Sequence, residues 1–483
     1  MVLSIKMCFH SDRLLQLLLF IPYLTICAGT LTPYVTPIFG DFASKEEQEK
    51  IQSQKPVVKD TSTPAVISDN ALRRIDTYIY RSRDMEQIVK KIPANIQDSI
   101  FVEPASCINV LVQFLTANQN DEFLKVKNIH DWIADNISYD VASFLAGNLP
   151  DQGWVEILKR KTSVCAGYAG LFQKMCDIAG ITCNKISGYA RGYRFRLFED
   201  ENPFVSNHDW NAVYINNWWY LIDVTWDAGY FDGKSFNKIY STEYLFLEPE
   251  KMIYTHIPMD DQWQLLDDPI NKSEIVLLPK YEGRYFEYDL NVIPGLKKVN
   301  TVADQTSIRF KVPEYVDISA VLFDEAGREY ENMTFVQKNS NEMQLLIKFP
   351  FPGKFKLELF NKCNSEIMYW DCAEFGYIAS DSSHTQFPAT TYYFENYQCF
   401  LYSPLYSPLE VGKKETIKIR IPGAKRVYMS GGGERFEFDR ETPDKDIFIL
   451  SFDVPETEEL RVYATKDENA EIFEGIIRFN VIK

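Results

Sequence analysis

The chain has 483 residues, of which 46% are hydrophobic and 14% aromatic, so it can build sizeable cores and has room for about three domains. Its formal net charge of −17 at pH 7 argues against nucleic acid as a partner, because phosphate binding needs concentrated Lys and Arg. Beyond this exclusion the charge indicates only good solubility.

The N-terminus has the pattern of a secretory signal. Basic residues precede an apolar run over 14–28, which Gln16 and Pro22 interrupt. The run is shorter than the roughly 20 apolar residues of a spanning helix. We therefore predict a signal peptide over residues 1–29 and a secreted or extracellular protein, with a retained membrane anchor as the alternative.

Seven cysteines follow this segment, and an odd count in a secreted protein suggests one free thiol. The other six could form three disulfides, two of them across short turns. The predicted pairs are Cys176 with Cys183, Cys363 with Cys372, and by elimination Cys107 with Cys399.

Residues 30–70 are poor in large apolar groups and rich in polar ones, which predicts a flexible linker. Helical patterns follow over 71–92, 108–117 and 121–136, and another helix should run from Cys165 to about residue 179, with Gly180 as its stop signal. Strands are expected over 186–196, 209–215 and 218–225. Helices first and strands later make 71–268 an α+β domain.

From about residue 275 the chain has the alternation of β-strands, and it contains a weak internal repeat. The stretch 321–327 resembles 427–433, which lies 106 positions later, and 308–313 resembles 417–422. A period near 105 residues is the size of one sandwich domain. We therefore predict two tandem all-β immunoglobulin-like domains, over 275–382 and 383–483.

Cys165 is expected at the first turn of a helix. A helix N-terminus favours negative charge and lowers the pKa of a thiol there, and its free N–H groups could hold an oxyanion. Ala166 and Gly167 should crowd the sulfur little. Taken alone, such a cysteine is more readily a buried structural residue or half of a disulfide.

A hairpin adds a base and its partner. The pair Asn216–Asn217 separates two strand-like runs and predicts a two-residue turn. Pairing Ile215 with Trp218 then puts His208 and Asp223 on one face of the hairpin as diagonal neighbours, with their backbones about 7–8 Å apart. A carboxylate at that place can orient an imidazole and stabilise its cation.

These residues belong to a set of blocks that resembles the transglutaminase-like superfamily, in particular its kyphoscoliosis peptidase-like branch, over 71–268. The resemblance implies a papain-like core in which Cys165 is the nucleophile, His208 the general base and Asp223 its orienting partner. The blocks are Ile129-His-Asp-Trp-Ile133, Ser163-Val-Cys-Ala-Gly-Tyr-Ala169, Ile186-Ser-Gly-Tyr-Ala-Arg-Gly192, His208-Asp-Trp-Asn-Ala-Val213, Trp218-Trp-Tyr-Leu-Ile-Asp-Val-Thr-Trp226, Tyr254-Thr-His-Ile-Pro258 and Asp261-Gln-Trp-Gln-Leu-Leu266.

Three further residues are candidates for lining the substrate cleft: Trp132, Gln152 and Trp210. Core packing is the alternative for both tryptophans. His130 and Asp131 are expected on the exposed face of their helix or in its capping.

We predict no metal and no cofactor. The chain has no Cys-x-x-Cys pair, no His-Glu-x-x-His and no Gly-rich phosphate loop. Asp227 and Asp232 are candidates for calcium, but solvated loop acids are the default interpretation.

Two functions follow from these patterns. The first is a cysteine enzyme that acts on amide or peptide bonds of a protein or peptide substrate through a thioester, which water or an amine then resolves. The second is a catalytically silent extracellular scaffold or adhesion protein, whose β-sandwich domains bind partners outside the cell or at its surface. A papain-type protease fits badly, because its His lies about 130–150 residues after the Cys, whereas His208 follows Cys165 by 43.

Overall fold

The computed structural model describes residues 36–37, 76–117, 119–199, 201–288, 290–364, 366–441 and 446–483. The chain divides into two compact units, one within Tyr34–Val276 and one that covers Leu277–Lys483. The predicted signal peptide and linker lie outside the described residues, apart from β1 (Thr36–Pro37), which pairs with β7 (Tyr230–Phe231).

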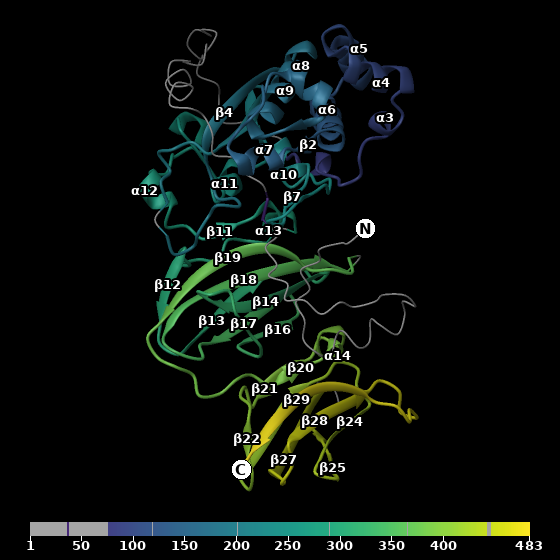
Figure 1. The fold of residues 1–483 in the computed structure, drawn as a ribbon. Helices are drawn as coiled ribbons and strands as arrows, with labels where there is room; N and C mark the ends of the chain where they lie inside the picture. The colour runs from purple at the N-terminus through teal and green to yellow at the C-terminus, as the bar shows by residue number, and fades with distance from the viewer. Residues whose placement is uncertain are drawn as a thin grey trace, which may run out of the picture. The chain divides into compact units, whose positions relative to one another are not determined.

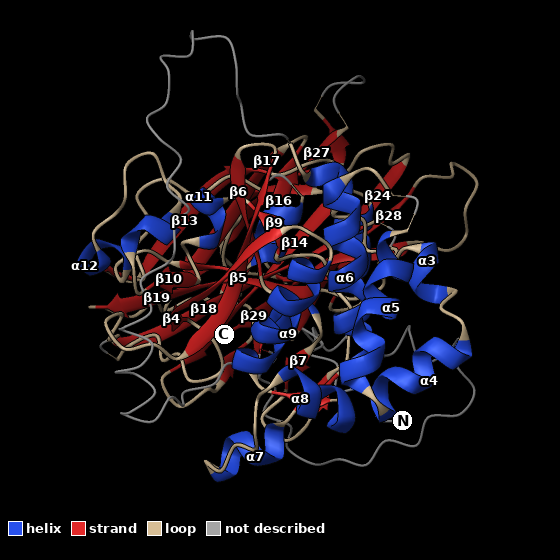
Figure 2. Cartoon of the chain, turned by 90° about the horizontal axis from the view of Figure 1, so that it is seen from above, coloured by secondary structure: helices blue, strands red, loops and turns tan. Residues whose placement is uncertain are grey.

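The first unit is α+β (Figures 1 and 2), with α9 packed against the sheet strands β4 and β5. Helix α6 begins where expected, because the Asp121 carboxylate accepts a hydrogen bond from the Phe123 N–H and caps the helix. The main helices are α3 (Gln87–Lys90), α4 (Ala94–Val102), α5 (Pro104–Thr116), α6 (Glu122–Asn136), α7 (Val141–Ala146), α8 (Trp154–Arg160), α9 (Cys165–Ile178), α10 (Val224–Asp227) and α11 (Pro249–Met252).

The prediction of a single helix over 71–92 is wrong for residues 76–92, the part of this segment that the structure describes. A 3-10 turn, η2 (Tyr78–Tyr80), and the short α3 occur there instead. Arg81 explains the interruption, because its guanidinium donates to the carbonyls of residues 242–243 and ties the segment to a distant loop.

The sheet of this unit has the strand order β10-β4-β5-β6-β9. The predicted hairpin is present: Ile215 pairs with Trp218, and both turn residues, Asn216–Asn217, have positive φ of 51° and 66°. The strands are β4 (Thr182–Ala190), β5 (His208–Ile215), β6 (Trp218–Ile222), β9 (Leu245–Leu247) and β10 (His256–Pro258).

Strand β6 ends three residues earlier than the predicted 218–225. Asp223 is the reason, since its carboxylate accepts hydrogen bonds from the N–H groups of Thr225 and Trp226 and thereby starts helix α10. The chain therefore turns from strand to helix at the candidate orienting residue.

The second unit contains two β-sandwiches of like topology. One pairs the sheet β11-β19-β18-β14-β15 with β13-β17-β16, and the other pairs β20-β29-β28-β24-β25 with β21-β23-β27-β26. In both, an extra strand runs parallel to the last strand: β12 beside β19, and β22 beside β29. Residues 321 and 427 of the predicted repeat fall on the corresponding strands β14 and β24. The exact boundaries, 275–382 and 383–483, stay predictions.

The strands of the first sandwich are β11 (Lys280–Tyr281), β12 (Val299–Val302), β13 (Gln305–Lys311), β14 (Val316–Asp324), β15 (Glu329–Tyr330), β16 (Thr334–Asn339), β17 (Glu342–Lys348), β18 (Gly353–Cys363) and β19 (Trp370–Ala379). Those of the second are β20 (Ala389–Thr390), β21 (Phe400–Ser403), β22 (Leu409–Glu410), β23 (Lys414–Arg420), β24 (Arg426–Gly431), β25 (Glu434–Glu437), β26 (Asp439–Arg440), β27 (Ile447–Asp453), β28 (Glu459–Thr465) and β29 (Glu474–Ile482).

Gly167→Ala tests how tightly the first turn of α9 is packed. A Cβ at residue 167 would lie 2.2 Å from Ser163 Oγ and 2.3 Å from Ile157 Cδ1, so we expect a loss of about 1–3 kcal/mol in the free energy of unfolding. Gly170→Ala on the same helix is the matched control, because a Cβ there meets nothing within 4 Å and should be neutral or stabilising. Urea unfolding measures both; equal effects of the two changes would contradict this packing.

Candidate active site

Cys165 is the first residue of α9, as predicted from the sequence. The N–H groups of Gly167 and Tyr168 donate to the Val164 carbonyl at 3.0 and 3.1 Å, so those of Cys165 and Ala166 have no acceptor inside the helix. The Cys165 side chain is a free thiol in a residue that is 5% exposed. The positive end of the helix dipole therefore lies at the sulfur and favours a thiolate or an oxyanion there.

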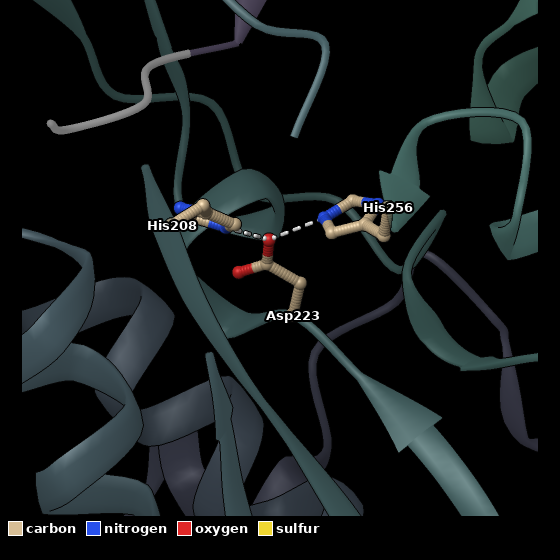
Figure 3. A group of neighbouring side chains, drawn as sticks. All are labelled: His208, Asp223 and His256. Carbon is tan, nitrogen blue, oxygen red and sulfur yellow. Dashed lines mark hydrogen bonds and ion pairs between the residues drawn. The ribbon is translucent and has the colours of Figure 1, made fainter. Parts of the chain in front are cut away.

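His208 and Asp223 meet as the hairpin register requires. His208 Nε2 lies 2.6 Å from Asp223 Oδ2, and both side chains are almost fully buried (Figure 3). The other oxygen, Oδ1, accepts hydrogen bonds from the N–H groups of Thr225 at 2.8 Å and Trp226 at 3.2 Å. The start of α10 thus fixes the carboxylate that orients the imidazole.

The ionisation of this group is set by its neighbours. Burial lowers the pKa of His208, but the charges and hydrogen bonds of Asp223 and Cys165 outweigh it and raise the pKa to about 10. Burial raises the pKa of Asp223, and His208 and His256 outweigh that effect and hold it well below its usual range. His208 is therefore an imidazolium at neutral pH, and with Nε2 on Asp223 its Nδ1 is the nitrogen left to face Cys165.

His256 is a member of the site that sequence reasoning missed. Its Nε2 lies 3.1 Å from Asp223 Oδ2, the same oxygen that bonds His208 (Figure 3). Its Nδ1 lies 2.9 Å from the Thr255 hydroxyl. His256 is on β10, 33 residues beyond Asp223, and only its place in the Tyr254–Pro258 block of the resemblance marked it.

Two imidazoles and a carboxylate are also a donor set that Zn²⁺ accepts. The ligand atoms of His208, Asp223 and His256 lie within 4.8 Å of one another. The separation of 2.6 Å between His208 and Asp223 is that of a hydrogen bond, whereas two ligands on one tetrahedral zinc lie about 3.3 Å apart. The geometry thus fits a hydrogen-bonded chain better than a metal shell, and the absence of a metal stays a prediction.

Trp210 packs beside the two imidazoles. It is 1% exposed, and its ring centroid lies 6.0 Å from that of His208 and 5.1 Å from that of His256. Gly188 allows this close approach, because a Cβ there would lie 2.3 Å from the indole. Trp210 thus packs beside both imidazoles, and its place in a substrate cleft stays a prediction.

The other two cleft candidates, Trp132 and Gln152, support the fold around Cys165. Trp132 is fully buried in the helical core and donates its indole N–H to Gln97 Oε1 at 3.1 Å, as the core-packing alternative requires; its place in a cleft stays a prediction. Gln152 Oε1 accepts from the Val164 N–H and the Ser163 hydroxyl, both at 3.1 Å. Gln152 therefore fixes the backbone that leads into Cys165.

The expectation that His130 and Asp131 face solvent is wrong, because both are fully buried. His130 Nδ1 lies 3.0 Å from Asp131 and its Nε2 lies 3.0 Å from Asp227, the last residue of α10. Lys127 Nζ lies 2.7 Å from Asp131 Oδ2 and forms a buried ion pair with it. Asp227 is thus no solvated loop acid, while Asp232 caps its own turn at Lys234. The network joins α6 to the helix that begins at Asp223.

The predicted disulfides are absent among the described residues, where all seven cysteines are free. Cys176 and Cys183 do lie together as buried thiols: burial first, and then Cys183, raises the pKa of Cys176. Cys372 instead donates to the Leu359 carbonyl at 3.3 Å. Neighbouring positions in the sequence were therefore a poor guide to cross-linking.

Residues 110–224 match the family model of the transglutaminase-like superfamily, and residues 272–390 match that of the KY-like, immunoglobulin-like domain. The chain therefore carries a transglutaminase-like domain followed by a KY-like immunoglobulin-like domain, which confirms the resemblance and the fold class.

Three curated relatives are similar to part of this chain. The chain is 29% identical over 265 residues to kyphoscoliosis peptidase of Mus musculus, covering 54% of this chain and 39% of the relative. It is 28% identical over 269 residues to that of Homo sapiens, with 55% and 40% covered. Hillarin of Drosophila melanogaster is 27% identical over 211 residues, with 40% and 25% covered. The chain thus spans two fifths or less of the length of these relatives.

The relatives correct the predicted localisation. Kyphoscoliosis peptidase, hillarin and cytokinesis protein 3 of Saccharomyces cerevisiae are cytoplasmic or cytoskeleton-associated. The last is 26% identical over 194 residues, with 38% of this chain and 22% of the relative covered. The prediction of a secreted or extracellular protein is therefore wrong. The apolar run behind it, and the alternative anchor, lie outside the described residues; within those residues no helix could cross a membrane.

His130→Ala should destabilise the protein. It leaves two buried carboxylates short of a partner, which costs about 3 kcal/mol or more in the free energy of unfolding. Burial lowers the pKa of His130, but Asp131 and Asp227 raise it above its ordinary value. The stabilisation is therefore present below the ordinary pKa of about 6.5 and is lost as pH rises through the raised value.

Urea unfolding of the wild type and the variant across pH 5 to 9 measures this difference. Exposed His384→Ala is the control and should change the free energy by no more than about 0.5 kcal/mol. A His130→Ala difference as small as that of the control, or one that grows with pH, would contradict the buried network.

Proposed function

We propose that the transglutaminase-like domain is a cysteine enzyme that attacks an amide or peptide carbonyl of a protein or peptide substrate and forms a thioester. The single observation that carries this proposal is the hydrogen bond of 2.6 Å between buried His208 and Asp223, beside a free cysteine at a helix N-terminus. A surface histidine would need none of these neighbours.

In the proposed reaction the imidazolium of His208 stabilises the Cys165 thiolate, which attacks the carbonyl carbon. His208 then gives its proton to the leaving amine, and Asp223 keeps the ring in place throughout. Water resolves the thioester by hydrolysis, or a second amine resolves it by transfer. Both outcomes use the same nucleophile and the same base.

One observation favours a second function, a catalytically silent scaffold that uses its β-sandwiches for binding. Cys165 is 5% exposed and His208 is 2% exposed, so a substrate carbonyl reaches the sulfur only through a narrow opening or after a movement. Cys165, His208 and Asp223 are all present. The hydrogen bonds that fix Asp223 and those that fix the backbone before Cys165 favour the enzyme.

Alkylation of Cys165 by iodoacetamide, read by mass spectrometry, separates the two functions. His208 stays protonated up to a pKa of about 10, so in the proposed ion pair its positive charge faces the Cys165 sulfur at neutral pH. Cys165 should then be alkylated about tenfold or more faster than Cys107 between pH 6 and 8. Half-buried Cys107 is the comparison within the same molecule.

Two variants sharpen the test. His208→Ala should slow labelling of Cys165 about 100-fold at pH 6, because the thiolate loses its counter-ion. Asp223→Asn removes the largest group that raises the pKa of His208, so the imidazole should lose its charge more readily and labelling of Cys165 should slow at neutral pH. A rate at Cys165 that matches Cys107 and ignores both substitutions would favour the scaffold.

A further inference from the structure

His256 is the second imidazole on Asp223, and the proposed reaction gives it no part. It begins β10, an edge strand that pairs with β4. Buried Arg191 fixes the segment before it, because its backbone N–H donates to the Thr255 carbonyl and its guanidinium donates to the Tyr254 carbonyl, each at 3.0 Å. The sheet and a buried arginine therefore hold the backbone of His256.

Aromatic side chains enclose the ring of His256. Its centroid lies 4.3 Å from that of Trp226, 5.1 Å from that of Trp210 and 5.4 Å from that of Tyr244. A ring packed on these sides has little freedom to turn. Its Nε2 therefore stays directed at Asp223 Oδ2, at 3.1 Å (Figure 3).

The direction of this hydrogen bond is fixed. Asp223 is ionised, and a carboxylate only accepts, so the Nε2 atoms of both His256 and His208 carry protons. Two N–H groups thus donate to the same oxygen, at 3.1 and 2.6 Å. The Thr255 hydroxyl lies 2.9 Å from His256 Nδ1 and serves there as donor or acceptor, which leaves the proton on Nε2 unaffected.

The two donors on Oδ2 behave differently during the proposed reaction. His208 changes its charge, because its Nδ1 proton goes to the leaving amine, whereas His256 keeps its Nε2 proton and its place. When His208 is neutral, the buried carboxylate has lost its counter-ion and depends on its remaining hydrogen bonds. The N–H of His256 therefore contributes most at the stage in which His208 has given up its proton.

We infer that His256 is a positioning residue for the proposed reaction, which holds Asp223 Oδ2 and stabilises the carboxylate while His208 is neutral. This inference rests on the proposed function. His256 acts through Asp223 on His208, and no bond to its own ring forms or breaks. Its effect is to make the neutral state of His208 easier to reach, both when the amine leaves and when water attacks the thioester.

Other titratable groups face this pair. Burial lowers the pKa of His208, and Asp223 and then Cys165 raise it. Tyr139 and Tyr168 feel the charge of Asp223, but burial first raises the pKa of both well above its ordinary value, so both hydroxyls stay neutral. Once its sulfur is acetylated, Cys165 carries no charge. In the acetyl-enzyme the charge of His208 thus depends on Asp223 and its second donor.

Hydrolysis of an acetyl group from Cys165 tests the inference on the full chain. p-Nitrophenyl acetate acetylates the sulfur, and water then attacks the thioester with neutral His208 as general base, so the rate against pH reports the charge of His208. Two amide substitutions form the matched pair. In His256→Gln the amide nitrogen takes the place of Nε2 and reaches Asp223, whereas in His256→Asn it takes the place of Nδ1 and reaches only Thr255.

His256→Asn should raise the midpoint of the pH profile by about one unit, so that hydrolysis below the midpoint becomes about tenfold slower. His256→Gln should keep the midpoint within about 0.3 unit of the wild type, because its donor remains on Asp223. Alkylation of Cys165 by iodoacetamide should stay within about twofold in both variants, because the ion pair with His208 remains.

Nitrogen-15 NMR of the wild type needs no variant to fold. His256 Nε2 should carry its proton from pH 5 to 9, and a bare Nε2 in this range would overturn the inference.

The two proposals fail in different ways. If the wild type forms no acetyl-enzyme at Cys165, the proposed function and this inference both fall. If the acetyl-enzyme forms and hydrolyses, but His256→Asn and His256→Gln share one midpoint, the inference alone falls. If a chelator by itself shifts the profile of the wild type, a metal ion holds the carboxylate in place of the His256 N–H, which also overturns the inference.

Discussion

The carboxylate of Asp223 is the constraint on which the site depends. One oxygen accepts two backbone N–H groups at the start of α10, and the other lies 2.6 Å from His208 and 3.1 Å from His256. Four donors thus converge on one buried residue. Because an unpaired charge there would be costly, the carboxylate can hold only this position. The end of a strand, the start of a helix and two imidazoles are all set by it.

Cys165, the proposed nucleophile, is fixed by separate contacts. The Asn211 amide of β5 donates to the Ala169 carbonyl of α9 at 3.1 Å, which ties the helix to the strand that carries His208. Gln152 and the short parallel pairing of β2 (Ser138–Tyr139) with β3 (Thr162–Ser163) hold the backbone before Cys165. Such a double support is what keeps reacting groups within the tolerance that catalysis needs.

Local patterns predicted the central part of this arrangement. A two-residue Asn turn fixes the register of a hairpin, and the register fixes which side chains share a face, so His208 and Asp223 could be brought together from sequence alone. The two β-sandwiches could be predicted from a weak sequence repeat, because the alternation of apolar and polar residues in a strand is also a local pattern.

The remainder depends on contacts that no local pattern carries. His256 reaches Asp223 from an edge strand 33 residues away. His130 and Asp131 are polar residues on a helix, which usually means solvent, and only the approach of Asp227 makes their burial possible. The wrong localisation has a similar origin, because a short apolar run has the same composition whether it is a signal or not.

The ionisation of His208 tests the account most directly, because it reports the pairing with Asp223 and Cys165 in one quantity. Nitrogen-15 NMR of the full chain with labelled histidine, assigned by comparison with His208→Ala, follows both ring nitrogens as the pH is raised. The account predicts that both stay protonated through pH 8 and that the ring titrates with a pKa of about 10, falling in Asp223→Asn. A ring that titrates near its ordinary pKa of about 6.5 in the wild type would contradict it.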